Sequence, residues 1–85
     1  MPIVVQRFES MQYDGTNGAE LVAWLNGSAD LVSDDGSHLV LLYVGSQRTL
    51  AVGDWAICGG SGAYRGFQGE MTPDLYAAIW REVTP

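Results

Sequence analysis

The stretch Val-Gly-Asp-Trp-Ala-Ile-Cys-Gly-Gly, residues 52–60, decides how the rest of the sequence is interpreted. Its Gly-Asp pair favours a turn, and the aromatic and β-branched residues that follow favour a strand. In that strand Cys58 and Ala56 share one face. Trp55 and Ile57 point to the other face and are expected to be buried. The stretch therefore predicts a turn that leads into a strand, rather than a catalytic loop.

Outward from this stretch, turn signals divide the chain into short strands and helices. Expected strands cover residues 3–9, 29–33, 38–44, 48–52 and 55–58, and the last four are predicted to form an antiparallel meander. The strand at 38–44 lacks alternation, which is typical of a strand covered on both faces. Residues 63–67 form either a short sixth strand or part of an irregular loop between glycines.

Two segments carry helix signals. Asn17, with Glu20 three residues later, makes a capping-box-like start to a helix over 17–26 that Gly27 closes. Thr72, Pro73 and Asp74 supply a cap, a first-turn proline and a dipole-favoured acid for a helix through about Ala78. Residues 79–83 either continue that helix or return to the sheet as an edge strand.

The predicted fold class is α+β. We expect a mainly antiparallel sheet or small open barrel, in the order β-α-β-β-β-β-(β)-α, with one or two short helices. The 85 residues, 47% of them hydrophobic, fit a single domain over 1–85 with one core. The single cysteine cannot form an internal disulfide, so packing must supply the stability.

Charge and hydropathy exclude some classes of function. Four arginines, no lysine and ten acids give a net charge of −6, so direct binding to nucleic acid is not expected. The longest apolar run, residues 39–44, is much shorter than a membrane span, so no membrane association is expected. The same acidity suits either a basic protein partner or solubility alone.

The chain offers few groups for chemistry. A nucleophilic Cys58 needs a base, and the one histidine, His38, is predicted near the surface at a strand end. The acids at Asp30, Asp34 and Asp35 surround a turn without the spacing of a calcium loop. The glycines of residues 59–69 do not follow a dinucleotide-binding pattern. We expect no enzyme activity, no metal site and no cofactor.

The second half of the chain, residues 52–80, resembles the C-terminal signature of a group of small, largely uncharacterised bacteriophage proteins. That signature runs approximately P-G-D-W-I-x-x-G-x-x-G-E-F-Y-P, and K-P-D-I-F-E-A-T-Y follows after a short gap. The matching positions are Gly53, Asp54, Trp55, Gly59, Gly62, Tyr64, Pro73, Asp74, Leu75, Tyr76, Ala78 and Trp80. The first half is similar at Gln6, Phe8, Trp24, Leu25 and Gly27.

The signature is not matched throughout. Val52 replaces its proline, Arg65 stands at an aromatic position, and extra residues occur at 67–70. The resemblance implies a phage origin, a β-rich fold and a location in the cytoplasm of the infected bacterial host. It implies no particular activity.

The function that these observations favour is a non-enzymatic bacteriophage accessory protein that binds and modulates a host bacterial protein. Its predicted partner-binding residues are Tyr64, Arg65 and Phe67, because Tyr, Arg and Phe are enriched at interface centres and glycines flank them. An open alternative is that Tyr64 and Phe67 are core residues and Arg65 is a surface residue. The alternative function is a homo-oligomeric structural or minor virion-associated protein, since a small sheet leaves free edges.

Overall fold

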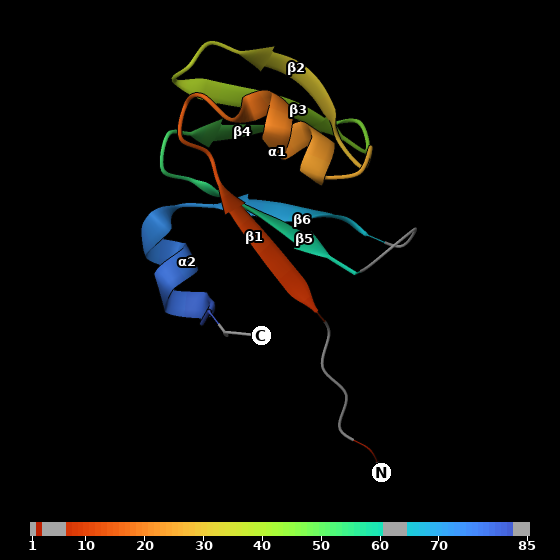
Figure 1. Ribbon diagram of the computed structural model, residues 1–85, viewed down its shortest axis with the longest axis vertical. Helices are drawn as coiled ribbons and strands as arrows, with labels where there is room; N and C mark the ends of the chain where they lie inside the picture. The colour runs from red at the N-terminus through yellow and green to blue at the C-terminus, as the bar shows by residue number, and fades with distance from the viewer. Residues whose placement is uncertain (1, 3–6, 61–64, 83–85) are drawn as a thin grey trace.

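A computed structural model describes residues 2, 7–60 and 65–82 (Figure 1). Six strands and two short helices follow one another in the order β1-α1-β2-β3-β4-β5-β6-α2. Their bounds are Phe8–Gln12 (β1), Gly18–Trp24 (α1), Asp30–Asp34 (β2), His38–Tyr43 (β3), Ser46–Ala51 (β4), Trp55–Gly59 (β5), Gly66–Met71 (β6) and Pro73–Ile79 (α2). The predicted α+β class with antiparallel strands is confirmed.

The strands form two three-stranded sheets. Sheet A has the order β1-β5-β6 and sheet B the order β2-β3-β4, with every pair antiparallel. The predicted meander of four strands is therefore wrong at its last step, because β5 pairs with β1 and β6 instead of β4. A turn separates β4 from β5: Gly53 has a φ of 97°, and the Asp54 carboxylate accepts a hydrogen bond of 2.9 Å from the Ala51 N–H. The turn itself is confirmed at the predicted residues.

The core lies between α1 and the two sheets (Figure 1). It is a single cluster of buried side chains to which both sheets and α1 contribute: Tyr13, Leu21, Leu25, Ala29, Leu39, Leu41, Leu50, Ala56, Cys58 and Phe67. Cys58 and Ala56 share the core face of β5, and Ile57 is buried on the opposite face, as predicted.

The apolar strand β3 is covered on one face only. Leu39 and Leu41 are fully buried, whereas Leu42 is 39% exposed. The prediction that this strand is covered on both faces is therefore wrong, because α2 packs against sheet A and leaves the outer face of sheet B open (Figure 1). The β3–β4 turn extends this open surface, since Val44 at its tip is 85% exposed.

Helix α1 is shorter than predicted and starts without a capping box. The Asn17 side chain makes no cap hydrogen bond. Its amide instead donates to the Gln12 carbonyl at 2.8 Å and accepts from the Asp14 N–H at 3.0 Å, which ties the helix start to the end of β1. The helix is closed at the predicted place, where Gly27 has a φ of 77°.

Helix α2 begins as predicted. The Thr72 hydroxyl accepts a hydrogen bond of 3.3 Å from the Leu75 N–H, and Pro73 opens the first turn, which also contains Asp74. Trp80 has extended backbone angles and ends the helix, and residues 80–82 join neither sheet. Arg81 and Glu82, which follow α2, line the cavity described next.

Candidate functional site

The two predicted partner-binding residues that the structure describes, Arg65 and Phe67, are both at least partly buried. Tyr64 lies outside the described residues. Phe67 is 1% exposed and packs edge-on against Tyr43, with 5.1 Å between ring centroids. Its prediction as a contact residue is corrected by this burial, because β6 points its side chain into the core. For Phe67 the alternative interpretation, a core residue, agrees with the structure.

Arg65 links three parts of the fold. Its Nε donates to the Trp24 carbonyl at 3.0 Å, and its guanidinium carbon lies 4.8 Å from the centre of the Trp24 ring. Its Nη1 also forms an ion pair with Glu9 on β1. Only 18% of the Arg65 side chain is exposed, so most of it contacts other residues of the fold. It fixes the end of α1 against the start of β1.

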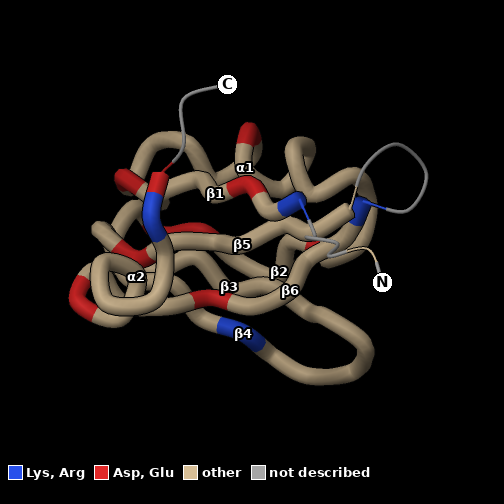
Figure 2. Tube along the Cα trace, turned by 90° about the horizontal axis from the view of Figure 1, so that it is seen from below, with Lys and Arg blue, Asp and Glu red and all other residues tan. Residues whose placement is uncertain are grey.

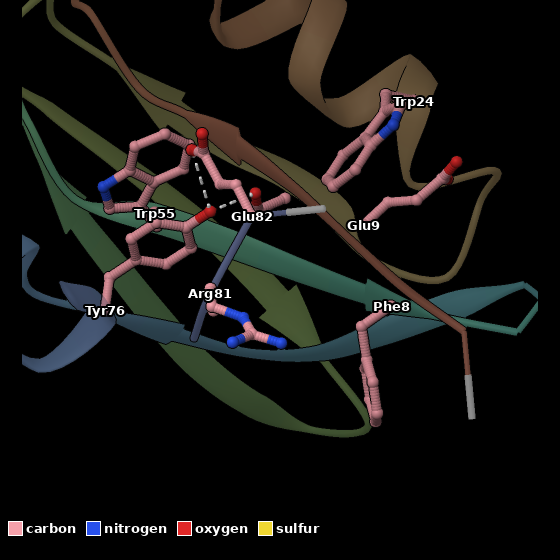
Figure 3. Close-up of a pocket in the computed structure, with 8 residues that line it drawn as sticks. Phe8, Glu9, Trp24, Trp55, Tyr76, Arg81 and Glu82 are labelled. Atoms are coloured by element: carbon pink, nitrogen blue, oxygen red, sulfur yellow. Dashed lines mark hydrogen bonds between the residues drawn. The ribbon is translucent and has the colours of Figure 1, made fainter. Parts of the chain in front are cut away.

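The residues that Arg65 fixes belong to the wall of an open cavity of about 530 Å³ (Figure 3). Side chains of β1, α1, β5, α2 and the segment after α2 line it: Phe8, Glu9, Ser10, Trp24, Trp55, Tyr76, Arg81 and Glu82. Neighbouring residues of a strand point to opposite faces of its sheet, so Glu9 and Ser10 lie on different faces. We call this cavity the β1 groove, because its lining comes from both faces of that strand.

The wall on the α2 side is held in place by aromatic stacking and hydrogen bonds. The rings of Trp55 and Tyr76 are nearly parallel, with centroids 4.0 Å apart. The Tyr76 hydroxyl is hydrogen-bonded to Ser10 Oγ at 2.8 Å and donates to Glu82 Oε1 at 3.4 Å. Figure 3 shows both hydrogen bonds meeting at the Tyr76 hydroxyl. The groove is therefore largely pre-formed, which lowers the entropy that a ligand loses on binding.

The floor of the groove is the free edge of β1. The Arg7 carbonyl accepts from the Gly60 N–H at 3.2 Å, and the Tyr13 N–H donates to the Asp54 carbonyl at 2.9 Å, so these residues face β5. Because backbone direction alternates along a strand, Phe8 and Ser10 direct their N–H and C=O groups away from β5. Within residues 7–60 and 65–82, no side chain bonds to these groups. They are available to another strand.

The groups considered for catalysis lie elsewhere. Cys58 is buried on β5, and burial raises the pKa of its thiol, which keeps the thiol protonated at neutral pH. His38 is exposed at the start of β3, as predicted. Asp35 closes the β2–β3 turn by accepting from the His38 and Ser37 N–H groups, which lowers the pKa of its carboxyl group. No cluster of three metal-ligating side chains occurs among the described residues.

Comparison of the chain with family models, with curated proteins and with solved structures gives no match. In the described part of the chain, neither helix combines the length and the apolar character that a membrane span requires.

Proposed function

We propose that the protein is a non-enzymatic binding module that captures an extended segment of a partner protein as an additional strand beside β1. The observation that carries the proposal is the β1 groove, a cavity of about 530 Å³ at a strand edge, lined from both faces of the strand. In strand addition, backbone hydrogen bonds supply affinity, and side chains that alternate between the two faces supply specificity. The groove offers both components.

Each sheet has two edge strands, β1 and β6 in sheet A and β2 and β4 in sheet B. β4 and β6 lie against each other and are joined by the ion pair of Arg48 and Glu70, so the comparison is between β1 and β2, and it favours β1 as the binding edge. At β2 the register shifts between Leu31 and Ser33, and the strand begins and ends with Asp30 and Asp34. Irregular register and acidic residues both discourage pairing of an edge with another chain. β1 pairs with β5 in regular register over all five of its residues, and the charge of its one acid, Glu9, is compensated by Arg7 and Arg65.

The partner that we propose is a protein of a bacterial host, reached in the host cytoplasm. This part of the proposal is supported by the resemblance of residues 52–80 to small bacteriophage proteins. It is independent of the geometry of the groove. Arg65 keeps a role in binding, but an indirect one. We propose that Arg65 positions the walls of the groove, through Trp24 and Glu9, instead of contacting the partner at its centre.

Replacement of Ser10 tests the proposal. The variant Ser10→Pro removes the outward N–H and places a ring at the free edge, where proline is tolerated because the bonds to β5 come from neighbouring residues. The control Ser10→Ala loses the same hydroxyl, and its hydrogen bond to Tyr76, but keeps the N–H. Each protein is presented to a yeast-displayed library of random peptides, and retained peptides are sequenced.

We expect the natural chain and Ser10→Ala to retain a common set of peptides that Ser10→Pro does not retain. Circular dichroism of the two variants establishes that both are folded. Retention of the same peptides by Ser10→Pro would contradict strand addition, and so would the absence of any enriched peptide with the natural chain.

A second candidate, a homo-oligomeric structural or minor virion-associated protein, is favoured by the open apolar surface of sheet B. Leu42 on its outer face is 39% exposed, Val32 at the irregularity of β2 is 48% exposed, and Val44 at the adjacent turn is 85% exposed. Light scattering across a wide range of concentration decides between the two candidates. A monomer at every concentration excludes this one, whereas a defined oligomer that is lost in Leu42→Asp and kept in Ala77→Asp, at an exposed position of α2, would favour it.

A further inference from the structure

The charges of the chain are distributed unevenly over the fold. The sequence has ten acids and only four arginines. One of these arginines, Arg81, lines the β1 groove. Arg7 and Arg65 do not line it, but both pair with Glu9 in its wall. The fourth lies on β4, away from β1 (Figure 2). Only two of the ten acids, Glu9 and Glu82, line the groove.

The two acids of the groove are already engaged. Glu9 Oε1 pairs with Arg7 at 3.0 Å, and Glu9 Oε2 pairs with Arg65. Glu82 accepts from the Tyr76 hydroxyl. Arg81 differs from them, because no carboxylate among the described residues lies within ion-pair distance of it. In Figure 3 its guanidinium lies between Tyr76 and Phe8.

Several aromatic ring faces in the groove are already covered, so they are not open to stack on a cationic ligand. Trp24 already holds the guanidinium of Arg65 over its ring, and Trp55 and Tyr76 cover one face of each other. Arg7 and Arg65 together carry one positive charge more than the Glu9 carboxylate that they pair with, and Arg81 balances Glu82. The surroundings of the groove therefore have an excess of one positive charge, which favours a carboxylate over a cation beside Arg81.

We infer that the segment captured by the groove carries side-chain carboxylates, one of which pairs with Arg81, with apolar residues at the alternate positions against the aromatic walls. This inference rests on strand addition at β1, and it names the chemistry of the partner segment. The acidic remainder of the molecule then contributes repulsion at long range, so selection of an acidic segment depends on short-range contact inside the groove.

Two peptides test the inference in solution. Both are acetylated and amidated heptapeptides with valine at alternate positions, and the remaining positions are all glutamate in one peptide and all lysine in the other. Each is titrated into the isotope-labelled protein at about 0.15 M salt, where charges more than roughly 8 Å apart are largely screened. Backbone amide signals of Phe8 and Ser10 report strand addition, and the concentration dependence of their shifts gives the affinity.

We expect the glutamate peptide to bind about tenfold more tightly than the lysine peptide. Arg81→Gln is expected to lower the affinity for the glutamate peptide about fivefold. Arg48→Gln, on β4, removes the same charge far from the groove and is expected to leave the affinity unchanged. An equal loss in both variants would overturn the inference, because net charge alone would then explain the preference.

The outcomes separate the inference from the function on which it rests. If the lysine peptide binds as tightly as the glutamate peptide and shifts the amide signals of Phe8 and Ser10, strand addition stands and the acidic partner is rejected. If neither peptide shifts those signals, both are rejected.

Discussion

Tyr13 is a fully buried side chain whose hydroxyl donates a hydrogen bond to Asp34, at the end of β2. Burial, followed by the hydrogen bond to Asp34 and the charge of that carboxylate, raises the pKa of Tyr13 to about 12. An unfolded chain ionises the same phenol near its ordinary value, about 10. The native state therefore favours the protonated phenol, and this contribution to stability is complete below about pH 10 and is lost as the pH rises toward 12.

We predict that the free energy of unfolding falls more steeply with alkaline pH in the natural chain than in Tyr13→Phe. The expected difference in slope is roughly 1.4 kcal/mol per pH unit above about pH 10. At neutral pH the variant is expected to be less stable by about 1 kcal/mol, because Asp34 loses a donor. Urea denaturation of both proteins from about pH 8 to about pH 11 measures this. Parallel curves would show that ionisation of Tyr13 does not limit alkaline stability.

At the scale of elements, α1 is seated on sheet B through a residue without a side chain. A Cβ added at Gly18 would overlap the carboxylate of Asp34 and come within 3.2 Å of Leu39 Cδ1. The Asp34 carboxylate cannot simply move aside, since it accepts hydrogen bonds from Tyr13 and from the Gly36 N–H. The close approach of helix and strand therefore requires glycine at this position.

We predict that Gly18→Ala destabilises the protein by roughly 1–3 kcal/mol, although alanine is the better helix former by about 1 kcal/mol. Ala23→Gly, at an exposed position of the same helix, measures the propensity term alone and is expected to cost about 1 kcal/mol. Thermal unfolding of the two variants compares them. A stability gain in Gly18→Ala would show that Asp34 and Leu39 yield without cost.

The elements that sequence predicts well are those set by local chemistry. The start of α2 follows from Thr72 and Pro73, and the turn before β5 follows from Gly53 and Asp54, because each depends on a few consecutive residues. The pairing of β5 is different. Its partners β1 and β6 are chosen by burial across the whole core, and no local pattern distinguishes them from β4. The prediction of a continuous meander failed for this reason.

The β1 groove could not be predicted for the same reason. Sequence places Trp55 on the face of β5 opposite Cys58, and the structure agrees, but Trp24, Tyr76 and Arg81 reach the groove from elements far apart along the chain. The sequence favours Tyr64, Arg65 and Phe67 as a binding surface instead, because Tyr, Arg and Phe are common in interfaces and glycines flank these residues. The period-two alternation of a strand that continues through Phe67 would have indicated its burial.

At the scale of the whole molecule, the two sheets share one core, and Cys58 lies in it at 1% exposure. We predict that its thiol reacts with a disulfide reagent only through global unfolding. The labelling rate at increasing urea should then follow the equilibrium constant measured by circular dichroism. Fast labelling without loss of the circular dichroism signal would show instead that sheet A opens independently of sheet B.

The pairing of β1 with β5 also has a consequence for synthesis of the chain. β1 leaves the ribosome before the other described elements, yet its partner β5 is made only after α1 and all of sheet B. Sheet B closes through two local hairpins, so it is able to form while β1 still waits. During this interval both edges of β1 are open, and the nascent chain offers its binding strand to any extended segment nearby before the groove around it exists.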